Sequence, residues 1–101
     1  MHNYGMFDKA QIEELTRRID EVLYYLWDPI GVSDEPCARG EYSTYVDSIY
    51  NLVIQEEDTK LITMLSEIES AYMGLNKNME KNKLIAKRLI NEKHAVENGL
   101  R

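Results

Sequence analysis

The stretch Trp27-Asp28-Pro29-Ile30-Gly31-Val32 separates an amphipathic segment before it from an aperiodic connection after it. Pro29 disfavours helical geometry at the preceding residue and has no backbone N–H to donate. Asp28 can accept hydrogen bonds from the backbone N–H groups that follow it, in an Asx-type turn. Gly31 permits a backbone conformation that other residues resist, and the apolar Ile30 is expected to fold under the helix ends. The stretch therefore predicts a helix stop, a turn cap and a core plug.

The segment before this stretch has the pattern of a helix over residues 9–27. Asp8 is a suitable N-cap, and Gln11 follows three residues later, as in a capping box. The repeat is shorter than the three or four heptads typical of a coiled coil, which favours a buried face within a bundle. The apolar side chains that recur at helical spacing are Ile12, Leu15, Ile19, Val22, Leu23 and Leu26.

Residues 28–40 have neither helical nor strand periodicity. They form a connection of about a dozen residues, which is long for a helical bundle. Connections of this length are usually functional or packed by their own side chains. We therefore expect a long ordered loop after the first helix.

Two further helices are expected in the middle of the chain. The first spans about 41–56 and has a broad aromatic and apolar face. The second begins at Thr59, with Asp58 as its N-cap, and Gly74 is a natural stop. The link between them is short, which predicts an antiparallel pair.

A fourth helix is expected over about 78–95, with Asn76 or Asn78 as its cap. Its apolar face is thin, and lysines and an arginine, Lys93 among them, are expected on its outer side. The sequence thus predicts an all-α fold, a single-domain bundle of about four helices spanning residues 1–101, with residues 1–7 and 96–101 as flexible tails. A chain of this length can bury one modest core.

Charge is distributed unevenly along the chain, whose formal net charge is −6. Residues 1–75 contain 15 acidic and 5 basic side chains, whereas residues 76–101 contain 3 and 7. An acidic body disfavours direct nucleic-acid binding, since phosphate contacts need Lys and Arg. It favours a basic protein partner through long-range attraction, although acidity can also serve solubility alone. The basic fourth helix is expected to dock against the acidic body.

No residue pattern in the sequence predicts a catalytic site or a metal-binding site. Neither His2 nor His94 has a second ligand at a spacing that predicts zinc, and there is no glycine-rich phosphate loop. The single cysteine, Cys37, rules out an internal disulfide and suits a reducing compartment such as the cytoplasm. No signal peptide or membrane span is predicted. Most carboxylates lie outside the apolar faces of the predicted helices and are expected to be solvated. Neither an enzyme nor a cofactor is therefore predicted.

Several motifs together resemble a known family of small bacterial helical proteins. They are Leu26 with the stretch 27–32, Glu41-Tyr42 with Tyr45, Ile68-Glu69, and Met73-Gly74-Leu75. The family has a Trp-Asp-Pro-Ile-Gly-Val signature followed by Glu-Tyr-Asp-x-Tyr, and here Ser43 stands where the aspartate is commoner. Many members are domains of unknown function, and some resemble immunity proteins encoded beside contact-dependent growth-inhibition or other polymorphic toxins. The resemblance covers about residues 20–90.

The resemblance implies structural signature residues and no catalytic residue to carry over. These signature residues are Trp27, Asp28, Pro29, Ile30, Gly31, Tyr42 and Tyr45. It also implies a cytoplasmic immunity protein that neutralises the C-terminal domain of a cognate toxin, with a ribonuclease as the expected class. Such a partner has a basic cleft, which an acidic surface would complement.

Exposed acids are therefore the candidate partner-binding residues. They are Asp34, Glu35, Glu41, Asp47, Glu56, Glu57 and Asp58. The alternative is an orphan helical interaction or regulatory domain with no toxin, in which these acids only solvate the surface. In that case the partner is another cellular protein or a second copy of the chain. No metal, cofactor or membrane contact is predicted by either hypothesis.

Overall fold

The computed structural model describes residues 7–27, 40–72, 74 and 78–99 of the chain. Every regular element in these residues is a helix, which confirms the predicted all-α bundle. The long loop predicted after the first helix lies outside the described residues. The same holds for Asp28, Pro29, Ile30 and Gly31 of the signature, and for Asp34 and Glu35.

The first helix has the predicted bounds, but its last turns are wider than those of an α-helix. Helix α1 (Lys9–Glu21) continues directly as a π-helical segment, η2 (Val22–Trp27). The predicted capping box is present at its start. The Gln11 backbone N–H donates to Asp8 Oδ1 at 2.8 Å, and the Asp8 N–H donates to Gln11 Oε1 at 3.0 Å. These two bonds satisfy N–H groups that the helix itself leaves unpaired.

The prediction of a single helix over residues 41–56 is wrong, because this segment forms two helices. Helix α2 spans Gly40–Ser43 and α3 spans Val46–Ile54, with a turn at 44–45 between them. At this turn the Tyr45 N–H donates to the Tyr42 carbonyl at 3.0 Å. Ser43 and Thr44 fall at the break, and residues of both types compete with the helix by bonding to nearby backbone groups.

The third predicted helix corresponds to α4 (Asp58–Glu67) followed by a π-helical segment, η4 (Ile68–Tyr72). The predicted N-cap at Asp58 is displaced by one residue. Glu57 holds the cap position, and Asp58 is already helical, with its Oδ1 accepting the Thr59 N–H at 2.7 Å. Gly74 has a φ of +68°, the left-handed conformation that commonly ends a helix.

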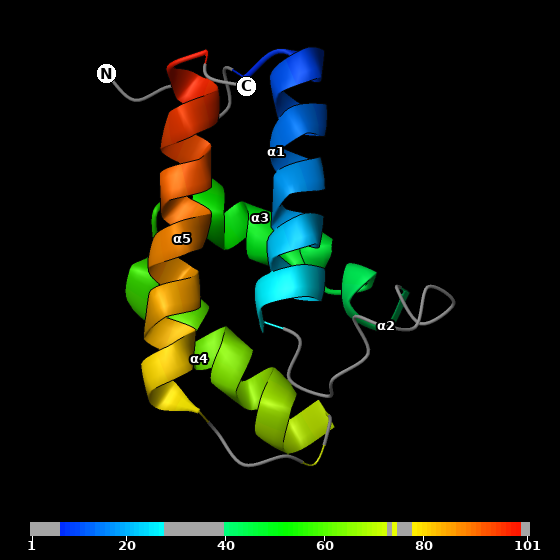
Figure 1. The fold of residues 1–101 in the computed structure, drawn as a ribbon, viewed down its shortest axis with the longest axis vertical. Helices are drawn as coiled ribbons and strands as arrows, with labels where there is room; N and C mark the ends of the chain where they lie inside the picture. Colours follow the sequence, from blue (N-terminus) through cyan, green and yellow to red (C-terminus); the bar gives the residue numbers. More distant parts are fainter. Residues whose placement is uncertain (1–6, 28–39, 73, 75–77, 100–101) are drawn as a thin grey trace.

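The last helix, α5 (Met79–Glu97), is the longest and contacts α1, η2, α3 and α4. Asn78 caps it, with its side-chain oxygen accepting the Lys81 N–H at 3.1 Å, as predicted. In Figure 1, α1 and α5 run side by side in opposite directions, α3 crosses behind them, and α4 lies across the end where α5 begins.

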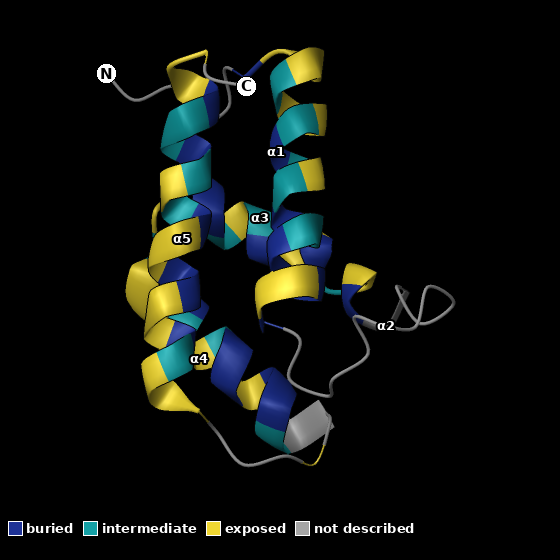
Figure 2. Cartoon of the chain, viewed as in Figure 1, coloured by how far each residue is buried: buried dark blue, intermediate teal, exposed yellow. Residues whose placement is uncertain are grey.

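The core lies between α1, α3, α4 and α5, and buried residues form the inner faces of these helices (Figure 2). Fully buried apolar side chains include Leu15, Ile19, Leu23, Trp27, Tyr42, Ile49, Val53, Leu61, Leu65 and Leu89. Phe7 and Val96, which fall in the predicted tails, are also buried in this core. Among the described helices, none is long and apolar enough to cross a membrane.

Several predicted faces are shifted in the structure. Ile12, expected on the buried face, is 42% exposed, and Leu26 is exposed as well. Leu84 of α5 is 69% exposed, whereas Lys93, expected on the outer side, is only 2% exposed. The true buried stripe of α5 includes Asn82, Ile85, Ala86, Leu89, Lys93 and Val96.

Candidate functional site

The predicted partner-binding acids in the described residues do not form one patch. Asp47 is exposed in the first turn of α3, while Glu56, Glu57 and Asp58 lie at the turn between α3 and α4. Glu41 belongs to α2, and its side chain is outside the described part of the structure. The acids therefore divide between two places, which must be considered separately.

Asp47 belongs to a groove between α1 and α3, with a volume of about 480 Å³. We call it the acidic groove; its lining residues are Ile12, Glu13, Thr16, Arg17, Asp20, Ser43, Val46 and Asp47. Three of these carry a carboxylate and one carries a guanidinium, so the lining has an excess of negative charge. The exposed part of Ile12 adds apolar surface to it. The combination suits a cationic partner with some apolar contact area.

Glu56 is exposed, but its carboxylate already contacts two side chains of α5. Its Oε2 accepts a hydrogen bond from Lys93 Nζ at 2.7 Å, and its Oε1 lies 3.2 Å from His94 Nε2. The bond to Lys93 is the main reason that the pKa of Glu56 is lowered from 4.5. Its φ of +54° is a left-handed conformation that L side chains rarely adopt. The role of Glu56 in partner binding stays a prediction, and its bonds within the protein would compete with a partner.

Lys93 occupies the centre of this cluster, which we call the Lys93 lock: Glu56, Lys93, His94 and Glu97. The Lys93 ammonium also lies 2.9 Å from Glu97. Burial works to lower the pKa of Lys93, but the hydrogen bonds to Glu56 and Glu97 outweigh it and the pKa is raised overall. Oxygens of the two glutamates and a nitrogen of His94 lie within 4.8 Å of one another, close enough to suggest a metal site. The ammonium already supplies the positive charge between the carboxylates, so an ion-pair lock describes the cluster better.

The other two acids of the turn have different surroundings. Glu57 forms an ion pair with Lys60 at 3.3 Å. Asp58 is exposed and lines a groove of about 470 Å³ between α4 and α5, opposite Lys83 and Lys87. With Glu56, this groove has two acids and two bases in its lining. Its charge is balanced, so it does not select a cationic partner.

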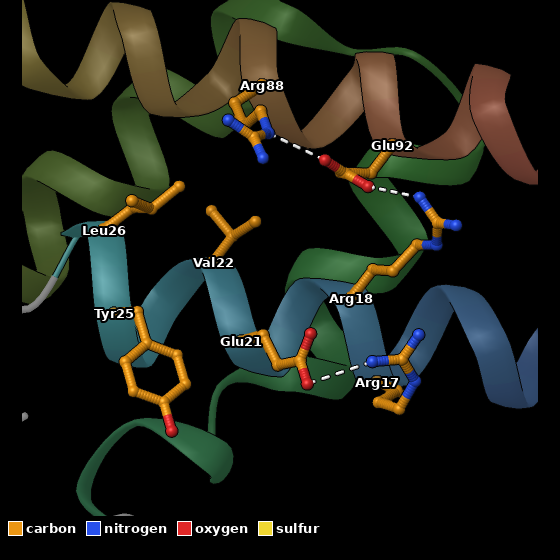
Figure 3. A pocket seen from close by; sticks show the side chains of 8 residues that line it. All are labelled: Arg17, Arg18, Glu21, Val22, Tyr25, Leu26, Arg88 and Glu92. Atoms are coloured by element: carbon orange, nitrogen blue, oxygen red, sulfur yellow. Dashed lines mark hydrogen bonds and ion pairs between the residues drawn. The ribbon is translucent and has the colours of Figure 1, made fainter. Parts of the chain in front are cut away.

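A third groove, of about 310 Å³, lies where α1 and η2 meet α5 (Figure 3). We call it the arginine groove; its lining residues are Arg17, Arg18, Glu21, Val22, Tyr25, Leu26, Arg88 and Glu92. Sequence reasoning missed it, because its charged residues come from segments about 70 positions apart, at a helix crossing that no local pattern specifies.

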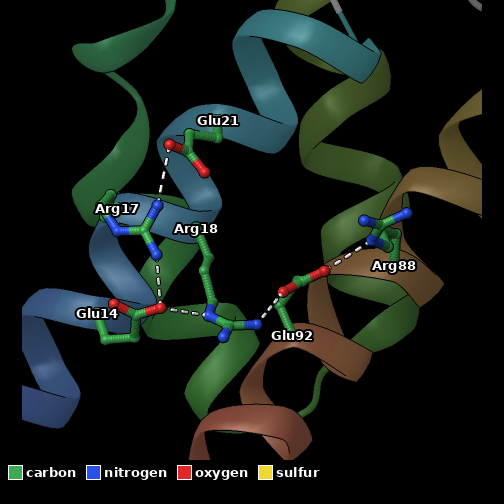
Figure 4. Close-up of polar contacts among 6 residues, drawn as sticks. All are labelled: Glu14, Arg17, Arg18, Glu21, Arg88 and Glu92. Atoms are coloured by element: carbon green, nitrogen blue, oxygen red, sulfur yellow. Dashed lines mark hydrogen bonds and ion pairs between the residues drawn. The ribbon is translucent and has the colours of Figure 1, made fainter. Parts of the chain in front are cut away.

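A ladder of ion pairs runs along one side of the arginine groove (Figure 4). Arg18 bonds to Glu14 at 2.7 Å and to Glu92 at 2.6 Å, and Arg88 bonds to the other oxygen of Glu92 at 2.7 Å. Burial acts to raise the pKa of Glu92, but the bonds to Arg88 and Arg18 together lower it. Arg18 therefore ties α1 to α5, and both its neighbours are held as carboxylates.

A buried polar chain links Trp27 to the start of α5 and the end of α4. Trp27 Nε1 donates to Asn82 Oδ1 at 3.0 Å, and Asn82 Nδ2 donates to Glu69 Oε1 at 2.7 Å and to Ser66 Oγ at 3.1 Å. All four side chains are buried. Glu69 was expected to be solvated; instead it also accepts the Asn78 backbone N–H at 3.1 Å, at the N-terminus of α5. Helix dipoles favour a carboxylate at that position.

Trp27 and Tyr42 pack together at this corner, with ring centroids 5.7 Å apart. Both are fully buried and thus part of the core, and Tyr45 packs against it. No protein-family model matches the chain, and neither the curated proteins nor the solved structures contain a match to it. The family resemblance accordingly stays a prediction from its motifs.

Proposed function

We propose that this chain is an immunity protein that binds and neutralises a cognate toxin domain through the acidic groove between α1 and α3. The observation that carries the proposal is the convergence of Glu13, Asp20 and Asp47 around the exposed part of Ile12. Among the three grooves described above, this is the one with an excess of negative charge in its lining. The motifs that resemble immunity proteins support the same function.

The chemistry of the expected partner explains why such a groove is useful. A ribonuclease attracts phosphate with lysines and arginines, so its active-site cleft is basic. Carboxylates placed opposite such a cleft increase the association rate and select the partner. An apolar side chain beside them supplies contact area that excludes water from the charged pairs. Blocking the cleft, or a surface next to it, would prevent substrate from entering.

The proposal is tested by co-expressing the chain with the toxin domain encoded in the adjacent reading frame. We expect the wild-type chain to restore growth and Asp47→Lys to lose this protection, because a lysine would face the basic cleft. Glu67→Lys is the matched control. Glu67 is exposed on α4 and does not line the groove, so this substitution makes the same change of charge at another place. Circular dichroism of both variants separates lost binding from lost folding.

Binding by purified proteins gives the second readout. The affinity should fall as the salt concentration rises, since screening weakens exposed charge pairs. This dependence of affinity on salt should be weaker for Asp47→Lys than for the wild type. Toxicity that persists with soluble wild-type chain present would contradict the proposal. Equal protection by Asp47→Lys and the wild type would place the contact elsewhere, and the absence of any adjacent toxin gene would favour the orphan interaction domain.

A further inference from the structure

The arginine groove has a charge opposite to that of the acidic groove. Its lining carries three guanidinium groups and two carboxylates, in a chain whose net charge is −6. Arg18 is engaged by Glu14 and Glu92 and is largely shielded from solvent. Arg88 differs, because its side chain is 55% exposed. Arg88 is therefore the arginine placed to meet a ligand.

The guanidinium of Arg88 retains hydrogen-bonding capacity. Its Nε bonds to Glu92, and within the described residues no hydrogen bond is found for its two terminal nitrogens. An arginine has five N–H donors in a planar fork, and the fork matches a carboxylate. Figure 3 shows this guanidinium on α5, across from Val22 and on the side that Leu26 faces. Glu92 holds the arginine in place while its outer edge faces solvent.

Apolar surface lies beside this charged edge. Tyr25 is 58% exposed and Leu26 is also exposed, both in the π-helical segment η2. Leu84 precedes Arg88 by one helical turn, so it lies on the same face of α5 and extends the apolar surface. Tyrosine and arginine are the residue types that dominate binding energy at protein interfaces. π-Helical segments are frequent at functional sites, which fits this placement.

From these observations we infer that the arginine groove binds a segment of a partner protein in which a carboxylate side chain lies close to an apolar one. The carboxylate meets the outer edge of Arg88, and the apolar side chain packs against Leu26, which Figure 3 shows on the side of η2 that faces Arg88. A volume of about 310 Å³ accommodates one or two side chains rather than a whole domain. Arg17 lines both this groove and the acidic groove, but Glu13, Asp20 and Asp47 line the acidic groove alone, so the two grooves take ligands of opposite charge.

Selection from a display library of random peptides of about a dozen residues on the immobilised full chain tests this inference. We expect the selected peptides to have Asp or Glu close to Leu, Phe or Tyr. Arg88→Gln and Leu26→Ala should each weaken binding of these peptides at least about tenfold. Lys87→Gln is the matched control, because it removes one charge from the adjacent position of α5 but lines the α4–α5 groove; it should change affinity less than about twofold.

Two further measurements test where the peptide binds and whether the chain self-associates. In NMR titration with a selected peptide, the backbone signals of Tyr25, Leu26 and Arg88 should shift, and Asp47→Lys should leave the affinity unchanged. Basic selected peptides, equal binding to Arg88→Gln, or no enrichment would overturn the inference. So would a concentration-dependent dimer that Arg88→Gln abolishes, since the groove would then be an interface between two copies of the chain.

Discussion

Two polar networks connect the first helical segment to the last, and they differ mainly in how much water reaches them. The buried polar chain joins Trp27 to Asn82 and Glu69 with distances of 2.7–3.0 Å. The ion-pair ladder joins Arg18 to Glu92 and Arg88 with distances of 2.6–2.7 Å. Geometry alone does not distinguish them. Solvent access distinguishes them at the outer end of the ladder, where Arg88 is 55% exposed, while Arg18 and Glu92 are largely shielded. A buried group left without a partner bears its full desolvation cost, whereas an exposed group can exchange its partner for water.

The comparison shows how structure and binding are separated in this molecule. Buried hydrogen bonds and ring packing hold Trp27 and Tyr42 in place. We therefore expect these two signature residues to contribute mainly to the stability of the fold. Arg88 in one groove and Asp47 in another are exposed, and these are the residues that we propose for contact with partners. A residue that binds a partner can therefore change without loss of the fold, which suits proteins whose partners differ.

The largest expected effect comes from the buried network. Trp27→Ala should lower the free energy of unfolding by about 3–5 kcal/mol, because it leaves a cavity and removes the donor to Asn82. Urea unfolding followed by circular dichroism measures this loss. Tyr25→Ala, two positions earlier in the same π-helical segment, is the control and should change stability by less than about 0.5 kcal/mol. Similar losses of unfolding free energy for the two variants would contradict the difference in stability that we assign to buried and exposed positions.

A smaller effect is expected at the Lys93 lock, which is intermediate between the two networks. Lys93 is buried, but Glu56 and Glu97 remain about one-third exposed. Lys93→Met preserves most of the volume and leaves two neighbouring carboxylates that water can still reach, so we expect a loss of about 1–3 kcal/mol. Lys87→Met on the exposed side of α5 should have almost no effect. An increase in stability for Lys93→Met would show that desolvation of the ammonium outweighs its ion pairs.

The smallest expected effect is a pH dependence at Glu56. Its pKa in the folded protein lies below the ordinary 4.5, so its carboxylate stabilises the fold fully above that pH. This contribution should be lost as pH falls below 4.5 through the lower folded-state pKa. The difference in unfolding free energy between the wild type and Glu56→Gln should therefore shrink between neutral pH and about pH 3. In a Lys93→Met background most of this dependence should vanish; a difference that persists unchanged would contradict the assignment.

Local signals in the sequence predicted several helix boundaries. The Asp8–Gln11 capping box and the cap at Asn78, one of the two candidates for α5, depend on neighbouring residues, and they are confirmed. Gly74, predicted as a helix stop, has the left-handed φ of +68° that suits one. The division at Ser43–Thr44 was missed, because the apolar spacing of Tyr42, Val46, Ile49 and Val53 continues across it. Periodicity reports which face is buried but does not detect a turn that preserves the face.

Long-range contacts were the part that the sequence could not specify. Lys93 was placed outside because it is charged, yet it lies four residues after Leu89 and three before Val96, both buried. That spacing put Lys93 and Asn82 on the buried stripe and was a signal for buried polar groups. Their partners, Glu56 and Trp27, are distant in sequence, and only the packing of the helices brings them within reach. The arginine groove escaped prediction for the same reason.

The coupling free energy between Trp27 and Asn82 tests the central claim, that the Trp27 corner is a dry structural network and the grooves are solvated binding surfaces. A double-mutant cycle with Trp27→Phe and Asn82→Ala isolates it, and the same cycle with Arg17→Gln and Glu21→Gln, whose ion pair at the rim of the arginine groove is about half exposed, gives the solvated reference. We expect a coupling of about 1–3 kcal/mol for the buried pair and about 0.5 kcal/mol or less for the pair at the groove rim. Equal couplings, or a larger one at the rim, would contradict the claim.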